Sequence, residues 1–358
     1  MTSANSLSSL PEYLTYDDVL LLPNYSEVTP NETDVAAQLT AKISLQLPIV
    51  ASPMDTVCEA PMAIAIGTLG GYGIIHRNFS IEDQVAEVKR VLAAGVSVGA
   101  AVGVGADFKD RVSALVKCGI GEICIDSAHG HSKNVLEAVR FIKKHYPKIE
   151  IIAGNVATYD GAKALFEAGA AAIKVGMGPG SICTTRIMSG MGVPQLSAVL
   201  ECVRAAKNLG GHVIADGGIR TSGDIVKALA AGAHSVMLGS LLAGTDEAPG
   251  DMIEIEGRLF KSYRGMGSIA AMKKGSDARY SQKYVEGKAK KLVPEGVEGL
   301  VPHRGPLSEH LHQLIGGLRA GMGYLGSKNL AQLREKAQFI RISRTAYVES
   351  QPHSITMR

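Results

Sequence analysis

The sequence predicts an α/β protein, a (β/α)8 TIM barrel with a long flap after the eighth strand. Eight short apolar, β-branched runs recur between residues 47 and 239, and each ends at a glycine or a polar residue. Segments with helical periodicity separate these runs. The 41 glycines and the lack of tryptophan suit many tight strand–helix turns. A doubly wound open sheet is the alternative, but no Gly-x-Gly-x-x-Gly motif follows an early strand.

The first two-thirds of the chain supplies the expected strands and helices. Between the strands, residues 81, 85, 88 and 91 are apolar and have helical spacing. Ser80 with Asp83, and Thr221 with Asp224, have the spacing of capping boxes that begin helices. The eight strands are expected, in chain order, at 47–51, 73–76, 98–103, 122–126, 149–155, 171–176, 212–218 and 235–239.

The pattern changes after the eighth strand. Residues 245–305 lack sustained periodicity and are rich in glycine, lysine and glutamate, so we expect a long irregular stretch with a flap at about 270–305. Such a stretch inside a compact protein is usually functional or disordered. A final helix is expected at 307–324, and a polar tail at 340–358. We interpret residues 1–358 as one domain.

Composition narrows the class of protein. The chain has 358 residues and a net charge of +3 without a dense lysine and arginine block, so we expect no nucleic-acid partner. Residues 1–10 lack a charged segment followed by an apolar core, and no span is long and apolar enough to predict a membrane helix. The five cysteines show neither metal-site pairing nor a disulfide framework, which favours the cytoplasm.

The loop at 176–190 is the strongest candidate for chemistry. It begins Gly-Met-Gly-Pro-Gly-Ser-Ile-Cys-Thr-Thr-Arg, directly after an apolar run. The glycines let the backbone approach a ligand, and hydroxyls and Arg186 are expected around the Cys183 thiol. This arrangement indicates a nucleophilic cysteine on a mobile loop. The alternative is a glycine-rich turn that carries an incidental buried cysteine.

Polar residues gather where the expected strands end, as an active site in such a barrel requires. Residues 215–220 and 237–240, after the seventh and eighth strands, combine glycines with a hydroxyl, so backbone N–H groups could bind a phosphate there. Those glycines could instead only make tight turns. Asp216 suits a ribose diol, because a carboxylate accepts two hydroxyl hydrogen bonds, although it could equally cap the following turn.

Several motifs together resemble the IMP dehydrogenase / GMP reductase family, and the similarity runs almost from end to end. They are Leu-Thr-Tyr-Asp-Asp-Val at 14–19, Ala-Ser-Pro-Met-Asp-Thr-Val at 51–57, Asp-Ser-Ala-His-Gly-His-Ser at 126–132, the cysteine loop, and residues 262–268. Each motif is a weak signal by itself, and their occurrence in this order is a strong one. The resemblance implies oxidation of IMP to XMP with NAD⁺.

The chain departs from the family's usual pattern in two places. Family members usually carry a pair of regulatory CBS modules after the second strand, whereas here only a few residues occupy 91–98, so these modules are absent. Gln351 stands where bacterial members often have histidine. Residues 194–218 look more like GMP reductase, but a reductase lacks the long flap, so we favour the dehydrogenase. A catalytically silent nucleotide-binding barrel is a further alternative.

The resemblance also implies roles for particular residues. Cys183 would form a covalent intermediate, and Thr185, Arg279 and Tyr280 would serve its hydrolysis. Arginine is an unusual base, and from the sequence alone Arg279 reads rather as a clamp for a phosphate or carboxylate. The residues implied for IMP are Ser52, Ser181, Asp216, Gly217, Gly218, Gly239, Ser240, Tyr263, Gly265, Met266, Gly267 and Glu295.

Two further sets follow from the resemblance. The residues implied for NAD⁺ are Asp126, Ser127, Ala128, Asn155 and Gly176, although Asp126 could instead be a structural acid at a strand end. A K⁺ site would use Gly178, Gly180 and Cys183, completed by Glu349, Ser350 and Gln351 of a neighbouring subunit. The alternative for the last three is a frayed terminus. Family members form homotetramers, and such a site would bridge two subunits.

Overall fold

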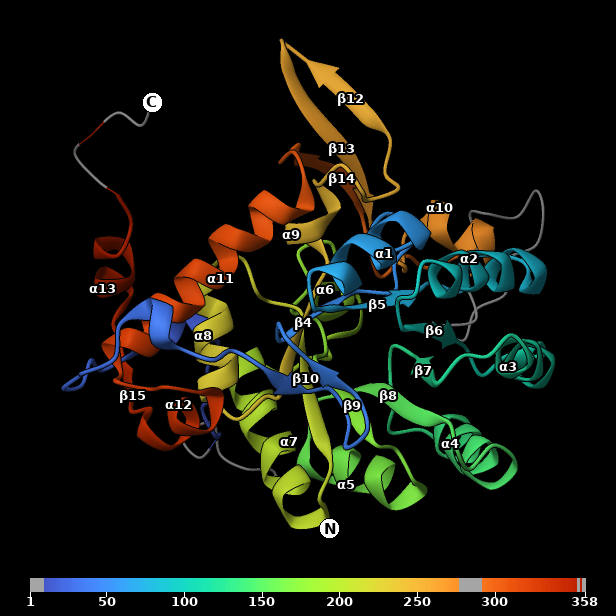
Figure 1. Ribbon diagram of the computed structural model, residues 1–358, viewed down its shortest axis with the longest axis horizontal. Coiled ribbons are helices and arrows are strands. Elements are labelled where there is room, and N and C mark those ends of the chain that lie inside the picture. Colours follow the sequence, from blue (N-terminus) through green and yellow to red (C-terminus); the bar gives the residue numbers. More distant parts are fainter. Residues whose placement is uncertain (1–9, 277–291, 353–354, 356–358) are drawn as a thin grey trace.

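Eight parallel strands close into a barrel in the computed structural model, which describes residues 10–276, 292–352 and 355 (Figure 1). The barrel closes where β11 pairs with β4, with Met237 beside Val50. Each predicted run overlaps one of these strands to within two residues at either end, so the predicted barrel is confirmed. The strands are β4 (Ile49–Ala51), β5 (Tyr72–Ile75), β6 (Val98–Val102), β7 (Glu122–Asp126), β8 (Glu150–Val156), β9 (Ala172–Val175), β10 (His212–Asp216) and β11 (Ser235–Leu238).

Helices surround the barrel. The expected capping interactions are present, because the hydroxyls of Ser80 and Thr221 accept hydrogen bonds from the backbone N–H groups of Asp83 and Asp224. The last helix of the ring, α11, contacts both α8 and α1, as closure of the ring requires. The ring consists of α1 (Ala60–Thr68), α2 (Ile81–Ala93), α3 (Phe108–Lys117), α4 (Lys133–His145), α5 (Tyr159–Ala168), α7 (Gln195–Leu209), α8 (Ser222–Ala230) and α11 (Leu307–Tyr324).

The barrel interior is filled by side chains in layers. A buried apolar layer includes Cys124, Ala172 and Ile214, which belong to three different strands. Because side chains alternate between the two faces of a strand, the residue two positions later on each strand also points into the barrel. Those residues are Asp126, Lys174 and Asp216, and they lie toward the carboxyl ends of β7, β9 and β10. The layering therefore places charged side chains directly above an apolar floor.

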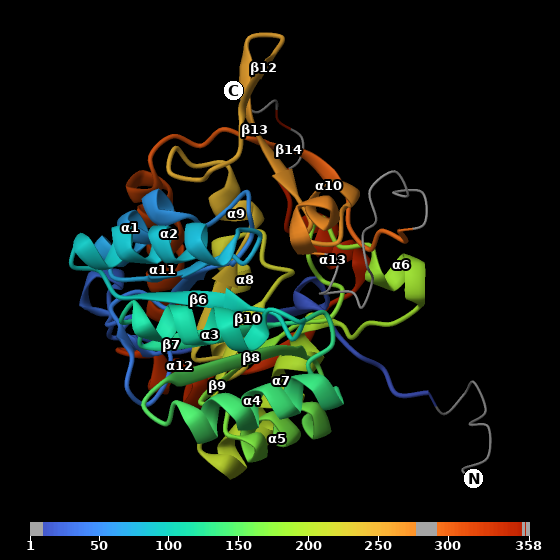
Figure 2. The same ribbon diagram turned by 90° about the vertical axis from the view of Figure 1, so that its right-hand side faces the viewer.

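A three-stranded antiparallel sheet projects from the barrel (Figures 1 and 2). It consists of β12 (Met252–Ile255), β13 (Arg258–Arg264) and β14 (Glu298–Pro302). The expectation of irregular structure throughout 245–305 is therefore wrong for these residues. All four residues of β12 are exposed, so the strand lacks the buried-and-exposed alternation by which a sequence pattern is recognised. Short helical turns follow at α10 (Ile269–Ala271) and 272–276.

The two ends of the described chain are joined. β1 (Val19–Leu21) pairs antiparallel with β15 (Phe339–Arg341), and α13 (Arg344–Glu349) contacts the short turn Tyr16–Asp18. Helix α12 (Leu330–Lys336) leads into β15, and the end of β15 and all of α13 lie within the predicted polar tail, so part of that tail is regular structure. Pairing with a strand more than 300 residues away leaves no local sequence signal.

A small hairpin covers one end of the barrel. It pairs β2 (Ala37–Gln38) with β3 (Ser44–Leu45), and its Leu39 and Leu45 are buried against the apolar interior. Lys42 of the hairpin forms an ion pair with Glu150 at the start of β8, so the hairpin lies at the amino ends of the strands. The carboxyl ends are left for the site.

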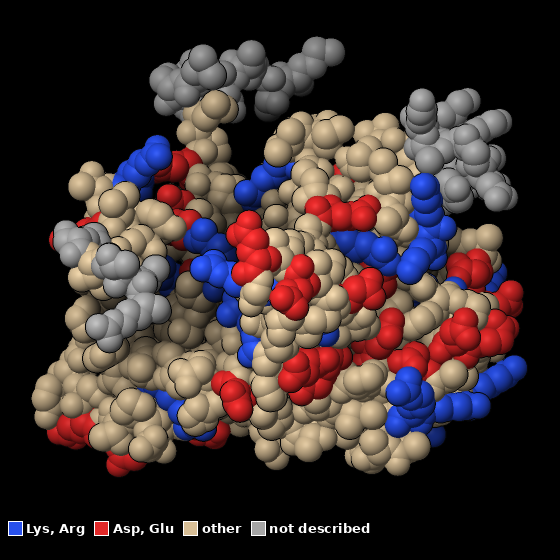
Figure 3. Space-filling model, turned by 90° about the horizontal axis from the view of Figure 1, so that it is seen from above, with Lys and Arg blue, Asp and Glu red and all other residues tan. Residues whose placement is uncertain are grey.

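The surface carries both signs of charge. Figure 3 looks down on the side from which the β12–β13 hairpin projects, and acidic and basic side chains are interspersed over it. Among the helices of the described residues, none is long and apolar enough to cross a membrane.

Candidate active site

A pocket of about 320 Å³ opens at the carboxyl ends of the barrel strands. It contains most of the residues that the sequence singled out. Residues of β7, β8, β9, β10 and β11 contribute to its wall, together with residues 52–54 directly after β4, the cysteine loop, and residues 263, 265–267 and 295. The predicted residues that line it are Ser52, Asp126, Ala128, Asn155, Gly176, Gly178, Gly180, Ser181, Cys183, Thr185, Asp216, Gly217, Gly218, Gly239, Ser240, Tyr263, Gly265, Met266, Gly267 and Glu295.

The cysteine loop leaves β9 in a conformation that requires glycine. Gly176 has φ of 155°, and a Cβ atom there would lie 2.0 Å from the carbonyl oxygen of Asp216. Arg186 closes the loop at its other end, since its guanidinium donates to the carbonyls of Val193 at 2.6 Å and Met177 at 3.4 Å. The cation that we expected beside the thiol therefore binds the two ends of the loop together.

The thiol itself has one hydroxyl partner. Cys183 Sγ donates to Thr185 Oγ1 at 3.2 Å, and both residues are half-buried at the start of α6 (Thr185–Ser189). Cysteine is nucleophilic as the thiolate, and the Thr185 hydroxyl can also donate to that anion. A nucleophile and an oxygen able to orient water are thus adjacent at the mouth of the pocket.

The segment before β14 lies against the cysteine loop. Thr184 N donates to the carbonyl of Glu295 at 2.9 Å, and Val297 N donates to the carbonyl of Ile182 at 3.0 Å. The same segment bonds the 265–267 loop, because Glu295 N donates to the carbonyl of Gly267 at 3.1 Å. These backbone bonds bring Gly267 and Glu295, both implied for IMP, beside Cys183, although they are 84 and 112 positions from it in the sequence.

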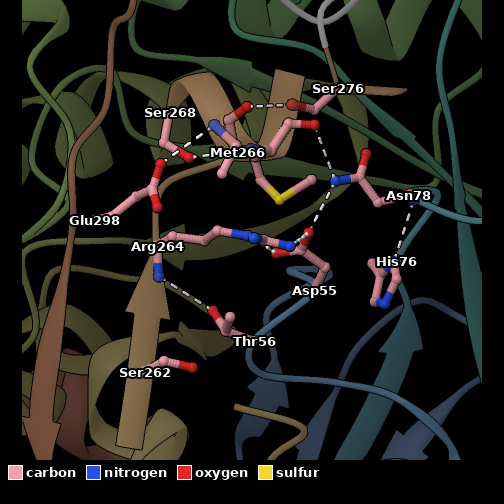
Figure 4. A network of polar contacts seen from close by, with 12 residues as sticks. Asp55, Thr56, His76, Asn78, Ser262, Arg264, Met266, Ser268, Ser276 and Glu298 are labelled. Carbon is pink, nitrogen blue, oxygen red and sulfur yellow. Dashed lines mark hydrogen bonds and ion pairs between the residues drawn. The ribbon is translucent and has the colours of Figure 1, made fainter. Parts of the chain in front are cut away.

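A polar network anchors the 265–267 loop to the barrel (Figure 4). Arg264, at the end of β13, donates to both carboxylate oxygens of Asp55, at 3.1 and 2.5 Å. Asn78 donates to Asp55 at 2.9 Å and to the carbonyl of Ala271 at 3.3 Å. Burial of Asp55 opposes its ionisation, but hydrogen bonds from Arg264 and Asn78 outweigh this and hold its pKa below the ordinary value.

Tyr263 directly precedes Arg264 on β13, so its side chain points to the opposite face of that strand. A Cβ atom on Gly239 would lie 2.7 Å from its hydroxyl oxygen, so glycine is needed for the two to approach. Burial raises the pKa of Tyr263 well above its ordinary value, and a hydrogen bond with Ser181 only partly opposes this. The phenol therefore stays protonated and can donate to an anion. Together with Ser52, Gly218 and Ser240 it forms a site rich in hydrogen-bond donors.

The predicted acids Asp126 and Asp216 are joined by a residue that the sequence analysis overlooked. Lys174 Nζ lies 2.7 Å from Asp126 Oδ1 and 3.2 Å from Asp216 Oδ2, and its side chain is 1% exposed. Asn155 Nδ2 donates to the same Asp216 oxygen at 2.9 Å. A signal was present, because Lys174 interrupts an otherwise apolar run on a strand expected to be buried.

Other pocket residues belong to motifs of the sequence, but no role was predicted for them. Arg220 forms an ion pair with Asp17, and both line the pocket although they are 203 positions apart. Such contacts depend on closure of the barrel and on the docking of the N-terminal segment. The remaining pocket residues to which the sequence assigned no role are Thr15, Tyr16, Pro53, Met54, Met177, Pro179, Ile182, Ile219 and Met237.

Six predicted residues are not among the described residues that line the pocket. Arg279 and Tyr280 lie outside the described residues. Ser127 does not line the pocket, and its backbone is instead hydrogen-bonded to Gly154 and Asn155 of β8. Glu349, Ser350 and Gln351 are exposed at the end of α13 and do not line the pocket of their own chain.

The pocket has features that suit a dinucleotide and a monovalent cation. Asn155 Oδ1 is buried without a partner among the described residues, and the side chain lines the pocket, so a ligand donor could satisfy this acceptor. The loop carries Gly178 with φ of 82°, and the carbonyl of Gly180 accepts from Cys183 N at 3.1 Å. Carbonyl oxygens of such a turn are the ligand type that hard cations prefer.

Comparisons with known proteins agree with the resemblance. A family model described as "IMP dehydrogenase / GMP reductase domain" matches residues 13–353. Inosine-5′-monophosphate dehydrogenase of Aquifex aeolicus is 42% identical, covering 97% of this chain and 96% of the relative. The proteins of that name from Borreliella burgdorferi and Bacillus subtilis are 45% and 40% identical, and each alignment covers 96% of this chain and 97% and 96% of the relative, respectively.

The lengths of these alignments differ from that of the chain. Those with the Aquifex and Bacillus proteins extend over 474 and 472 positions, whereas the chain has 358 residues. Those relatives therefore contain residues without a counterpart here. In the structure, residues 94–97 alone connect α2 to β6, at the place where the resemblance predicts the missing regulatory modules.

Proposed function

Because the chain belongs to the IMP dehydrogenase / GMP reductase family, we propose that it oxidises IMP to XMP with NAD⁺. The observation that carries this proposal is the Cys183–Thr185 pair at the mouth of a pocket that also holds Asp216 and the donor-rich site around Tyr263. The names of the relatives support oxidation over reductive deamination of GMP. The five cysteines form no disulfide, which supports a reducing, cytoplasmic location.

Substrate would be held at three points. The phosphate would accept hydrogen bonds from Ser181, Ser240, Tyr263 and the backbone around Gly218 and Gly239, with Ser52 nearby. The ribose hydroxyls would donate to Asp216. The hypoxanthine would lie against the 265–267 loop and Glu295, which are hydrogen-bonded to each other and pack beside the cysteine. This orientation directs the base toward Cys183.

In the first step the Cys183 thiolate adds to C2 of the hypoxanthine and forms an S–C2 bond. NAD⁺, when bound, accepts the hydride that leaves C2. Asp126, Ala128, Asn155 and Gly176 would line the dinucleotide side, with Ser127 adjacent. The product of the step is a thioimidate on Cys183, and the thiol proton has passed to solvent or to a nearby base.

In the second step water attacks C2, the S–C2 bond breaks, and XMP leaves as the thiol is restored. Thr185 is positioned to orient that water because its oxygen lies 3.2 Å from the sulfur. Arg279 and Tyr280, outside the described residues, would supply the base. Arg279→Ala should spare the initial burst of NADH and slow XMP release; equal loss of both steps would contradict this division of roles.

A cation and a larger assembly complete the proposal. Carbonyls of Gly178, Gly180 and Cys183 would bind K⁺ together with residues 349–351 of a neighbouring subunit in a homotetramer. The exposed end of α13 supports this arrangement, because residues 349–351 do not line the pocket of their own chain. The cation would hold the cysteine loop in its bent conformation.

The test is a steady-state assay at 340 nm. The purified protein should form NADH from IMP and NAD⁺, faster with K⁺ than without it, and should not consume NADPH with GMP. Incubation with 6-chloropurine ribotide should yield a mass adduct on Cys183. NADPH consumption with GMP would make the protein a reductase, and nucleotide binding without adduct or turnover would indicate a silent barrel.

A further inference from the structure

We propose that Lys174 is a positioning residue that couples the nucleotide site to the dinucleotide site. This inference rests on the proposed function, which assigns Asp216 to the ribose of IMP and Asp126 to the dinucleotide. Lys174 contacts both carboxylates, at 2.7 and 3.2 Å, from a side chain that is 1% exposed.

The fold places the three charges together. Asp126, Lys174 and Asp216 come two residues after Cys124, Ala172 and Ile214, which form part of the apolar layer inside the barrel. Their side chains therefore point to the barrel axis from β7, β9 and β10. The two lysine contacts limit the distance between the carboxylate oxygens to at most about 6 Å. Asp126 is buried, and the side chain of Asp216 is 17% exposed.

Two carboxylates this close, above an apolar floor, repel each other strongly unless a cation lies between them. Lys174 supplies that cation, and burial in contact with both acids restricts its own movement. Removing the charge would drive the acids apart or make one of them bind a proton. Either response would displace the Asp216 oxygens from the positions at which they receive the ribose.

The contacts also decide which oxygen of Asp216 meets substrate. Lys174 and Asn155 both bond Oδ2, and no donor in the described part of the chain bonds Oδ1. Oδ1 can therefore accept the ribose hydroxyls. The ammonium group has three donors, so a loss of its bond to Asp126 would let it turn further onto Asp216 and compete with the ribose for Oδ1.

Coupling follows from this sharing. Any change at Asp126 alters how tightly Lys174 binds Asp216, because the same ammonium group contacts both acids. A dinucleotide that engages Asp126 should thus change the affinity for IMP, and IMP should change the affinity for the dinucleotide by the same factor. The site of one substrate then responds to occupation of the other.

The test is a double-mutant cycle read by equilibrium binding of IMP without dinucleotide, in a calorimeter. Asp126→Asn should weaken IMP binding about fivefold or more in the wild-type background, the lower range for coupled sites. Lys174→Met should weaken it further. In the Lys174→Met background this loss should disappear or reverse: Asp126→Asn should leave IMP binding unchanged or improve it, because it removes one of two like charges. Lys174→Arg should retain part of the affinity.

A matched control is available in Lys261, a second buried lysine, which bonds the carbonyls of Thr245, Asp246 and Ala248 and no pocket acid. Lys261→Met should lower thermal stability without changing the affinity for IMP. Thermal unfolding of every variant separates misfolding from lost binding. If Lys174→Met alone unfolds, the double variant is compared with Asp126→Asn instead. It should bind IMP at least as tightly, because no ammonium group remains to compete for Asp216, and weaker binding would contradict the inference.

An equal fold loss from Asp126→Asn in both backgrounds would overturn the inference, as would wild-type IMP affinity in Lys174→Met. Both results would leave the proposed function standing. A wild-type protein without measurable IMP affinity would instead overturn the proposed function, and this inference with it.

Discussion

At the scale of single residues, Cys183 carries the proposed chemistry. We expect Cys183→Ala to fold and bind IMP but to lose at least about 10³-fold in kcat, because water cannot replace a positioned thiolate in the first step. NADH formation and IMP binding, measured on the same preparation, check this. Cys118→Ala is the control, because Cys118 directly follows α3, is half-buried and does not line the pocket. Substantial turnover by Cys183→Ala would rule out covalent catalysis.

A second residue-scale prediction concerns Glu122, which is fully buried inside the barrel on β7. Burial raises the pKa of its carboxyl from 4.5 to about 8, with the nearby Tyr72 hydroxyl opposing and the charge of Glu150 adding to the rise. At pH values between 4.5 and about 8, Glu122 keeps its proton in the folded protein and releases it in the unfolded chain. Stability should therefore fall as the pH rises from about 5 to 8, and then level off.

Glu122→Gln should remove this decline in the free energy of unfolding. The decline amounts to a few kcal/mol, at about 1.4 kcal/mol per pKa unit. Urea unfolding at a series of pH values measures it. Glu137→Gln, an exposed glutamate on α4, should keep the wild-type slope. The prediction is wrong if the two variants show the same pH dependence.

At the scale of elements, the projecting sheet is fastened to the barrel through Asp55 and Arg264. The Arg264 side chain is 17% exposed and that of Asp55 5%, so loss of one partner leaves a nearly buried charge unbalanced. Breaking such a pair costs about 3–5 kcal/mol. We expect Asp55→Asn to lower the stability and to raise the KM for IMP about tenfold, because the 265–267 loop follows Arg264 directly.

Thermal unfolding and steady-state kinetics test this anchor. Arg204→Ala, which removes an exposed pair with Glu201 on α7, should change neither quantity appreciably. An unchanged KM in a destabilised Asp55→Asn protein would show that the anchor supports the sheet without shaping the site.

At the scale of the whole molecule, the described chain leaves apolar side chains exposed near both of its joined ends, among them Tyr25, Tyr324 and Val348. We expect these surfaces to be covered in a homotetramer of about 150 kDa, four times the 37.6 kDa chain. Light scattering after size-exclusion chromatography measures the mass. A monomer that retains K⁺ activation would contradict a cation site shared between subunits.

How far the sequence predicts this protein depends on whether the signal is local. The eight strands were found because each is a buried run bounded by glycine or polar residues. The 307–324 helix was found because its periodicity is local too. β12–β14 and the β1–β15 pair were missed, because exposed or distant strand pairing leaves no periodic pattern. The glycine turns at 215–220 and 237–240 were predicted because polar groups at strand ends converge once a parallel barrel closes. Most other pocket residues were implied by the resemblance to the family.

The sequence by itself determined the barrel, the cysteine loop and the family, since these depend on local patterns and on motifs in a fixed order. Only the tertiary structure decided which side chains share a partner. Lys174 lies 48 positions from Asp126 and 42 from Asp216, and closure of the barrel makes it their common cation. The Cys183 loop likewise meets residues 295–297 only after the chain returns from the projecting sheet. Contacts of this kind depend on long-range closure, which no local run of residues encodes.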